Sequence, residues 1–230
     1  MTYIIIFVLV LLLLFFSSYN QSVTYKDFGD PFSSVRICFI AGVHGNEPAA
    51  SLHLSSLLES DYFDRMSQRG IFIRVIPRVN EFGLDMGIRY QNSLFHPDIN
   101  RMFGEEGEND IISKDMIKLT RDMTLIVDFH EGWGFHLLDD KSLGSTLTVT
   151  NSVKSLGQKI IKRINEKISE PFRKFVILNR MCKIKEAFSC YNNVRSRNYI
   201  LVETSGQNNI QDLNIRQDQI QIVIETCLEI

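Results

Sequence analysis

The chain has 230 residues, of which 44% are hydrophobic, and its formal net charge at pH 7 is −2. This length and apolar fraction suit one sizeable domain with a hydrophobic core. The balanced charge supplies no basic field for a nucleic-acid backbone, so the composition argues against nucleic acid as a partner.

The N-terminus carries an unbroken apolar run, YIIIFVLVLLLLFF, over residues 3–16. A membrane-spanning helix needs roughly 20 apolar residues, whereas a shorter run fits the core of a signal peptide better. We therefore expect residues 1–21 to be a signal peptide or signal-anchor and residues 22–230 to form the folded domain. The chain would then be secreted, or anchored to a membrane through residues 3–16. The alternative is that the run is a buried strand or helix of the domain.

The remaining pattern alternates strands with helices. In chain order it predicts a strand at 35–41, a helix at 48–58, a strand at 71–76, a helix at 111–120, strands at 124–129 and 147–150, a helix at 153–168, strands at 174–178 and 199–203, and a helix at 215–228. Such alternation predicts an α/β fold, a three-layer sandwich with a mostly parallel, twisted sheet flanked by helices. Functional sites of such folds lie at the carboxyl ends of the strands.

Four cysteines are present, and none has the C-x-x-C spacing of a structural zinc site. Cys38 lies in an apolar strand pattern, which predicts a buried thiol. Cys182 and Cys190 are close enough in sequence to form a disulfide, and a protein of the secretory pathway permits one.

Two short motifs carry metal-binding side chains at the ends of predicted strands. Residues 41–47 (AGVHGNE) supply His44 and Glu47, and residues 127–132 (VDFHEG) supply His130. Two imidazoles and one carboxylate are a common ligand set for a catalytic zinc ion with an open position for water. The motifs therefore predict one Zn²⁺ per chain.

The order and context of the motifs resemble the zinc metallocarboxypeptidase superfamily, and within it the succinylglutamate desuccinylase/aspartoacylase branch. The resemblance covers residues 35–206. It rests on a strand, HGNE and a helix, then P-x-x-N-x-x-G at 77–83, D-x-N-R at 98–101, a strand with D-x-H, and a late strand that ends in Glu203. It implies a zinc carboxypeptidase-like catalytic domain with the same three zinc ligands.

The resemblance also implies roles for the residues around the metal. Asn100 and Arg101 would bind the free carboxylate of the substrate, and a guanidinium suits such a bidentate pair. Asp98 would orient His44, as carboxylates do for metal-bound histidines. Arg89 would polarise the scissile carbonyl, with Arg78 as the competing candidate.

Glu203 matches the catalytic glutamate of the family, which takes a proton from the attacking water. Glu131 is the rival base, although alternation along a strand turns it away from His130. Asp128 has two open roles, as a partner of a zinc ligand or as a cap of the strand end. Tyr191 is the candidate for the mobile tyrosine of carboxypeptidases, because Tyr199, the other tyrosine shortly before Glu203, lies in a strand pattern.

Together these residues predict a zinc-dependent hydrolase that cleaves an amide bond next to a free carboxylate. The substrate would be a peptide or an N-acyl amino acid. A metallocarboxypeptidase is favoured, because residues 204–230 do not suffice for the C-terminal β-domain that narrows the site of aspartoacylase-type enzymes. An N-acyl amino-acid deacylase is the first alternative, and a non-catalytic zinc-binding module is the second.

Overall fold

The computed structural model describes residues 22–91, 98–104 and 110–229. The predicted leader at 1–21 lies outside these residues. Within them, no helix is both long enough and apolar enough to cross a membrane.

A seven-stranded sheet forms the middle of the described structure, with the strand order β1-β3-β2-β4-β7-β5-β6. The central strands β3, β2, β4 and β7 are parallel, while β1 pairs with β3 and β5 pairs with β7 in the antiparallel sense. The expected mostly parallel sheet is confirmed. The strands are β1 (Lys26–Phe28), β2 (Val35–Ala41), β3 (Ile71–Ile76), β4 (Leu125–Gly132), β5 (Thr146–Val149), β6 (Val176–Ile177) and β7 (Tyr199–Ser205).

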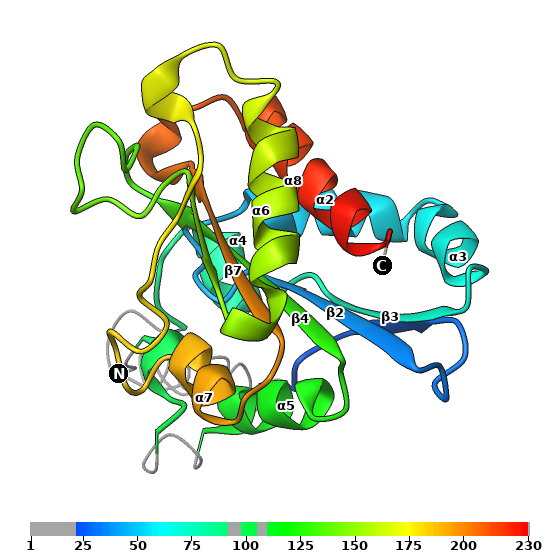
Figure 1. Ribbon diagram of the computed structural model, residues 1–230. Helices are drawn as coiled ribbons and strands as arrows, with labels where there is room; N and C mark the ends of the chain where they lie inside the picture. Colours follow the sequence, from blue (N-terminus) through cyan, green and yellow to red (C-terminus); the bar gives the residue numbers. More distant parts are fainter. Residues whose placement is uncertain (1–21, 92–97, 105–109, 230) are drawn as a thin grey trace, which may run out of the picture.

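Helices cover both faces of the sheet, as the three-layer prediction requires (Figure 1). One face carries α2, α3, α6 and α8, and the other carries α5 and α7. The helices are α2 (Ala49–Leu58), α3 (Tyr62–Ser67), α4 (Glu81–Met86), α5 (Ile111–Thr120), α6 (Lys154–Asn165), α7 (Phe188–Val194) and α8 (Leu213–Cys227).

Alternation along the strands divides the buried side chains into two cores. In β4, Val127 and Phe129 pack into the core under α2 and α8, and Ile126 packs into the core under α5 and α7. Successive side chains of a strand point to opposite faces. Asp128 and His130 therefore share the α5/α7 face with Ile126, and this places a polar cluster at the carboxyl end of that face.

The strands and helices predicted in the sequence are present. β2, β3 and α5 have the predicted bounds, and the other elements have shifted ends. β4 and β7 extend beyond the predicted ends, so His130 lies inside β4 rather than after it, and Glu203 lies inside β7 rather than at its end. The strand expected at 174–178 shortens to Val176–Ile177, and α6 ends at Asn165. β1, α3, α4 and α7 were not predicted, because each is too short to show a hydrophobic period.

The predicted Cys182–Cys190 disulfide is present and closes the segment that leads into α7. Cys38 is a buried free thiol, as expected. Burial raises the pKa of its thiol well above the usual range, so Cys38 is an inert core residue.

Candidate active site

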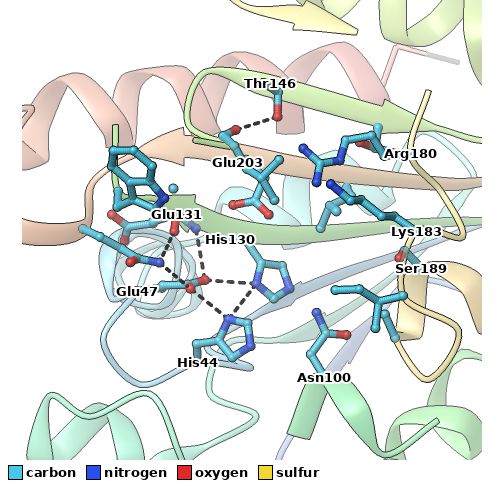
Figure 2. Close-up of a pocket in the computed structure, with 18 of the residues that line it drawn as sticks. His44, Glu47, Asn100, His130, Glu131, Thr146, Arg180, Lys183, Ser189 and Glu203 are labelled. Atoms are coloured by element: carbon cyan, nitrogen blue, oxygen red, sulfur yellow. Dashed lines mark hydrogen bonds and ion pairs between the residues drawn. The ribbon is translucent and has the colours of Figure 1, made fainter. Parts of the chain in front are cut away.

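Three predicted metal ligands converge at the carboxyl end of the sheet (Figure 2). His44 Nδ1 lies 2.8 Å from Glu47 Oε1, and His130 Nδ1 lies 3.0 Å from Glu47 Oε2. The two Nδ1 atoms are 3.1 Å apart. All three side chains are buried, and one ligand atom from each fits within a span of 4.8 Å. The cluster thus has the composition and the compactness of a metal site.

Glycines bring the first ligand pair into position after β2. Gly42 has a φ of 74°, which a residue with a side chain rarely adopts, and it turns the chain toward His44. A Cβ at Gly45 would lie 1.9 Å from the backbone carbon of Gly83, so this approach requires glycine. Glu47 follows just before α2. The short HGNE string therefore works as a tight strand-to-helix turn.

A carboxylate lies behind each histidine. His44 Nε2 is 3.0 Å from Asp98 Oδ1, which is the contact that the resemblance implied. His130 Nε2 is 3.3 Å from Asp128 Oδ2, close enough for an ion pair although not aligned as a hydrogen bond. The hydroxyl of Tyr199 donates to Asp128 Oδ2 at 2.6 Å. Of the two roles open for Asp128, the structure supports the partner of the candidate metal ligand His130.

The donor set fits a divalent metal. The Nε2 atoms of His44 and His130 face carboxylates and carry the ring protons, which leaves a lone pair on each Nδ1. These two lone pairs and a carboxylate oxygen of Glu47 are three acceptors directed at one small space. Acceptors this close repel one another unless a proton or a cation lies among them. Imidazole and carboxylate ligands suit zinc.

The directions of the pKa shifts within the cluster show that it favours positive charge. Burial alone would raise the pKa of Glu47, but His44 and His130 outweigh burial and hold that pKa well below its usual range. Burial alone would likewise lower the pKa of His130, yet Asp128 and Glu47 raise it well above its usual value. The protein without metal therefore holds protons where the ligand set would hold a cation.

Glu203 lies directly beside the cluster. It is the register partner of His130 across the β4–β7 pair, so both side chains point to the same face. The carboxylate is buried and, among the described residues, no hydrogen bond holds it in place. Burial is the main cause that raises its pKa to about 8. A carboxylate of this kind is suited to accept and return a proton near neutral pH.

Arg89, and not Arg78, reaches the cluster. Its guanidinium donates to Asp98 Oδ2 at 2.8 Å and to Glu47 Oε1 at 3.2 Å, and it lines the cavity in front of the ligands. Arg78 pairs with the exposed Asp85 on the surface. The structure thus separates the two candidates by place.

Asn100 and Arg101 also line the cavity, in a short 3₁₀ turn that Asp98 caps. The backbone N–H of Phe188 donates to Asn100 Oδ1 at 3.0 Å, which leaves the amide nitrogen as the free donor of that side chain. Arg101 donates to the Asn100 carbonyl at 2.8 Å and lines the cavity. Both residues can donate to one carboxylate.

Glu131, the rival base, is already held. Its carboxylate accepts from the backbone N–H of Ala49 at 2.6 Å and pairs with the buried Arg216. Tyr191 is not in the cavity either, since it is buried on α7 and stacks on Phe188. Tyr199 is held by Asp128, as described above. Neither tyrosine is therefore free to approach a ligand.

The cavity measures about 270 Å³ and contains residues that the sequence did not single out. Gln207 donates to Glu47 Oε1 at 2.9 Å, so it holds the side chain of a candidate metal ligand in place. Arg180 and Lys183 reach the cavity from the segment before α7, and Trp133 lines it from the end of β4. Trp133 follows His130 closely in the sequence, which left open a place in the pocket wall or in the core, and the structure places it in the wall. Nothing in the local sequence marks the other three residues, because only the folding of separate segments brings them together.

Comparisons with known proteins support the fold. No protein-family model matches the sequence, and no curated protein matches it. Among solved structures, the cell-shape determinant Csd4 of Helicobacter pylori superposes with a TM-score of 0.72 at 17% identity. The murein-tripeptide amidase MpaA of Escherichia coli O157 superposes with a TM-score of 0.62 at 14% identity. The chain has a zinc carboxypeptidase-like fold.

The coverage of these matches differs. The superposition with Csd4 takes in 90% of this chain but only 54% of Csd4, so the chain spans about half of that protein. With MpaA the superposition takes in 91% of this chain and 90% of the amidase. With a candidate metallopeptidase of Shewanella amazonensis, the superposition takes in 92% of this chain and 84% of that protein, with a TM-score of 0.67 at 16% identity. The matched structures are a carboxypeptidase, a metallopeptidase and an amidase, and they do not specify the desuccinylase/aspartoacylase branch.

Proposed function

We propose that the protein is a zinc-dependent hydrolase that cleaves an amide bond next to a free carboxylate, as a metallocarboxypeptidase. The observation that carries this proposal is the convergence of His44, Glu47 and His130 on one point, with the unheld carboxylate of Glu203 beside them. The metallopeptidase-like fold supports it. Csd4, described as a D,L-carboxypeptidase, has been solved with a tripeptide and with mDAP bound.

The proposed roles follow from the positions of the side chains. Bound Zn²⁺ would supply Lewis-acid activation of water and of the scissile carbonyl. Glu203 accepts the proton of the attacking water and returns it to the leaving amine. Arg89 supports the negative charge that develops on the carbonyl oxygen. Asn100 and Arg101 hold the free carboxylate and so set which bond faces the metal.

The test is a digest followed by mass spectrometry, with the full-length zinc-loaded protein and a pool of peptides and N-acyl amino acids. We expect loss of single C-terminal residues from the peptides. Glu203→Gln should lower kcat about 10²- to 10⁴-fold and still bind one zinc ion. His44→Ala should bind zinc poorly and be inactive, while the exposed Glu170→Gln should match the wild type.

Three results separate the alternatives. Release of amino acids from the N-acyl set alone would identify a deacylase. Full activity of Glu203→Gln on any substrate would overturn the proposed mechanism. No turnover by a protein that binds zinc would favour a non-catalytic module.

We also propose that the protein lies outside the cytoplasm, secreted or anchored through residues 3–16. The apolar run and the Cys182–Cys190 disulfide support this, since such disulfides persist in oxidising compartments. Thiol labelling of protein from its native cells should modify Cys182 only after reduction. Labelling without reductant would argue against this location.

A further inference from the structure

Two cations reach the cavity from the segment between β6 and α7. Arg180 and Lys183 both line it, and Figure 2 shows their side chains extending toward the space in front of Glu203. Within the part of the chain that the structure describes, no carboxylate lies within ion-pair distance of either side chain. Both side chains retain contact with solvent. Their positive charge is therefore not neutralised by the protein.

The acidic residues of the cavity do not compensate for these cations. Glu47 pairs with Arg89, and Glu131 pairs with Arg216. Glu203 is the one other carboxylate among the described residues of the lining. It lies by the metal ligands, and its proposed role requires it to be free. The wall formed by Arg180 and Lys183 thus carries surplus positive charge.

The fold holds this wall in place. The backbone N–H of Lys183 donates to the carbonyl of Arg180 at 3.0 Å, so the two residues share one turn. Met181, between them, is buried in the core that α7 covers. The Cys182–Cys190 disulfide then ties the turn to α7. A charged turn anchored at two points is better suited to bind a ligand than two free surface side chains, because less conformational freedom is lost on binding.

We propose that Arg180 and Lys183 form a second anion subsite, so that the substrate carries a second anionic group besides the carboxylate assigned to Asn100 and Arg101. This inference rests on the proposed function, since it names the substrate class of the same site. A guanidinium beside an ammonium suits a carboxylate through charge-assisted hydrogen bonds. The second carboxylate can belong to the C-terminal residue or to an acidic acyl group, and the two sources are distinguished below.

Binding is measured without turnover. Trp133 is the single tryptophan of the chain and lines this cavity, so its fluorescence reports a bound ligand. The protein is the full-length, zinc-loaded Glu203→Gln variant, whose kcat, expected to be about 10²- to 10⁴-fold lower, keeps ligand consumption small during a titration. N-acetyl-glutamate should bind about 10- to 100-fold more tightly than N-acetyl-glutamine, the range expected for one charge-assisted contact. If the acyl group is the source, N-succinyl-leucine should show this preference over N-succinamoyl-leucine instead.

The variant Arg180→Gln/Lys183→Gln, made in the same background, should bind the charged and neutral ligands equally. Lys185→Gln is the matched control, because Lys185 is exposed on the same segment and does not line the cavity. It should keep the preference. The subsite is overturned if the Glu203→Gln protein with Arg180 and Lys183 intact binds charged and neutral ligands equally. It is also overturned if the preference for the charged ligand survives the double substitution.

Turnover separates this inference from the proposed function. The zinc-loaded wild-type protein is incubated with peptides that end in Glu or Gln. It is also incubated with leucine that carries a succinyl or a succinamoyl group. Hydrolysis without a preference for charge overturns the subsite and leaves the proposed function standing. Charge-dependent binding with no hydrolysis of any substrate overturns the function and leaves the subsite standing.

Discussion

At the scale of single residues, Glu203 combines a buried position with a proposed role that requires a charged carboxylate. Burial raises its pKa to about 8 from an ordinary value of 4.5. In the metal-free protein, folded Glu203 keeps its proton up to about pH 8, whereas the unfolded chain releases it near pH 4.5. The folded state therefore binds more protons in this window, and its stability must fall as pH rises.

We expect Glu203→Gln to remove this dependence. The slope from one such group is at most about 1.4 kcal/mol per pH unit. Urea unfolding with a chelator at pH 5 and pH 8 measures it, and the variant should gain stability relative to the wild type at pH 8 but not at pH 5. The raised pKa of His130 also lowers stability at high pH, but it does so in both proteins. The prediction would be contradicted if the free energy of unfolding changed equally between pH 5 and pH 8 in the wild type and in the variant.

Some residues of the candidate site could be predicted from the sequence, and others could not. His44, Glu47 and His130 could be predicted because they sit in short strings with metal-ligand chemistry at the ends of strands. Arg180 and Lys183 could not, because two isolated cations in an irregular segment have no local signature. Their role depends on which distant segments the fold brings opposite them.

At the scale of elements, the cap of the short helix α4 also contacts the backbone of Arg89. Asn80 accepts from the Gly83 N–H at 2.9 Å and caps the helix, and its amide nitrogen reaches the Arg89 carbonyl at 3.4 Å. We expect Asn80→Ala to cost about 1 to 2 kcal/mol of stability and also to lower kcat/KM, because Arg89 loses a tether.

The matched control is the cap of α5. Asp110 accepts from the Ser113 N–H at 3.0 Å, and it does not line the cavity. Asp110→Ala should therefore lose about 1 kcal/mol with unchanged kcat/KM. Chemical denaturation and steady-state kinetics on both variants check this pair. Equal kinetic effects would show that Asn80 acts only on stability.

The elements also show which parts of a fold a sequence predicts. The central strands are buried on both faces, so their apolar runs stand out and were located correctly. The carboxyl ends of β4 and β7 were predicted too early, because these two strands lengthen each other through pairing, up to Gly132 and Ser205. Such an extension depends on the partner strand and is not encoded in either segment alone.

At the scale of the whole molecule, a buried ion pair joins α8 to the edge of the sheet that carries the candidate active site. Arg216 of α8 pairs with Glu131 of β4, and both side chains are almost fully buried. Arg216→Met would leave the Glu131 carboxylate buried without a partner, and we expect a loss of about 3 to 5 kcal/mol.

Adding Glu131→Gln to this variant should restore part of the loss, since no charge is then left unpaired. Thermal or urea unfolding of both variants and of Glu131→Gln alone closes the double-mutant cycle. Additive losses would indicate that the pair contributes through packing and not through charge.

The two edges of the sheet are short. β1 spans Lys26–Phe28 and places charged side chains along its margin, and β6 has two residues, Val176 and Ile177. Neither edge offers a long row of unpaired backbone groups to a strand from another molecule. The sheet is thus poorly suited to recruit further strands, and the protein should resist fibril formation even at high local concentrations.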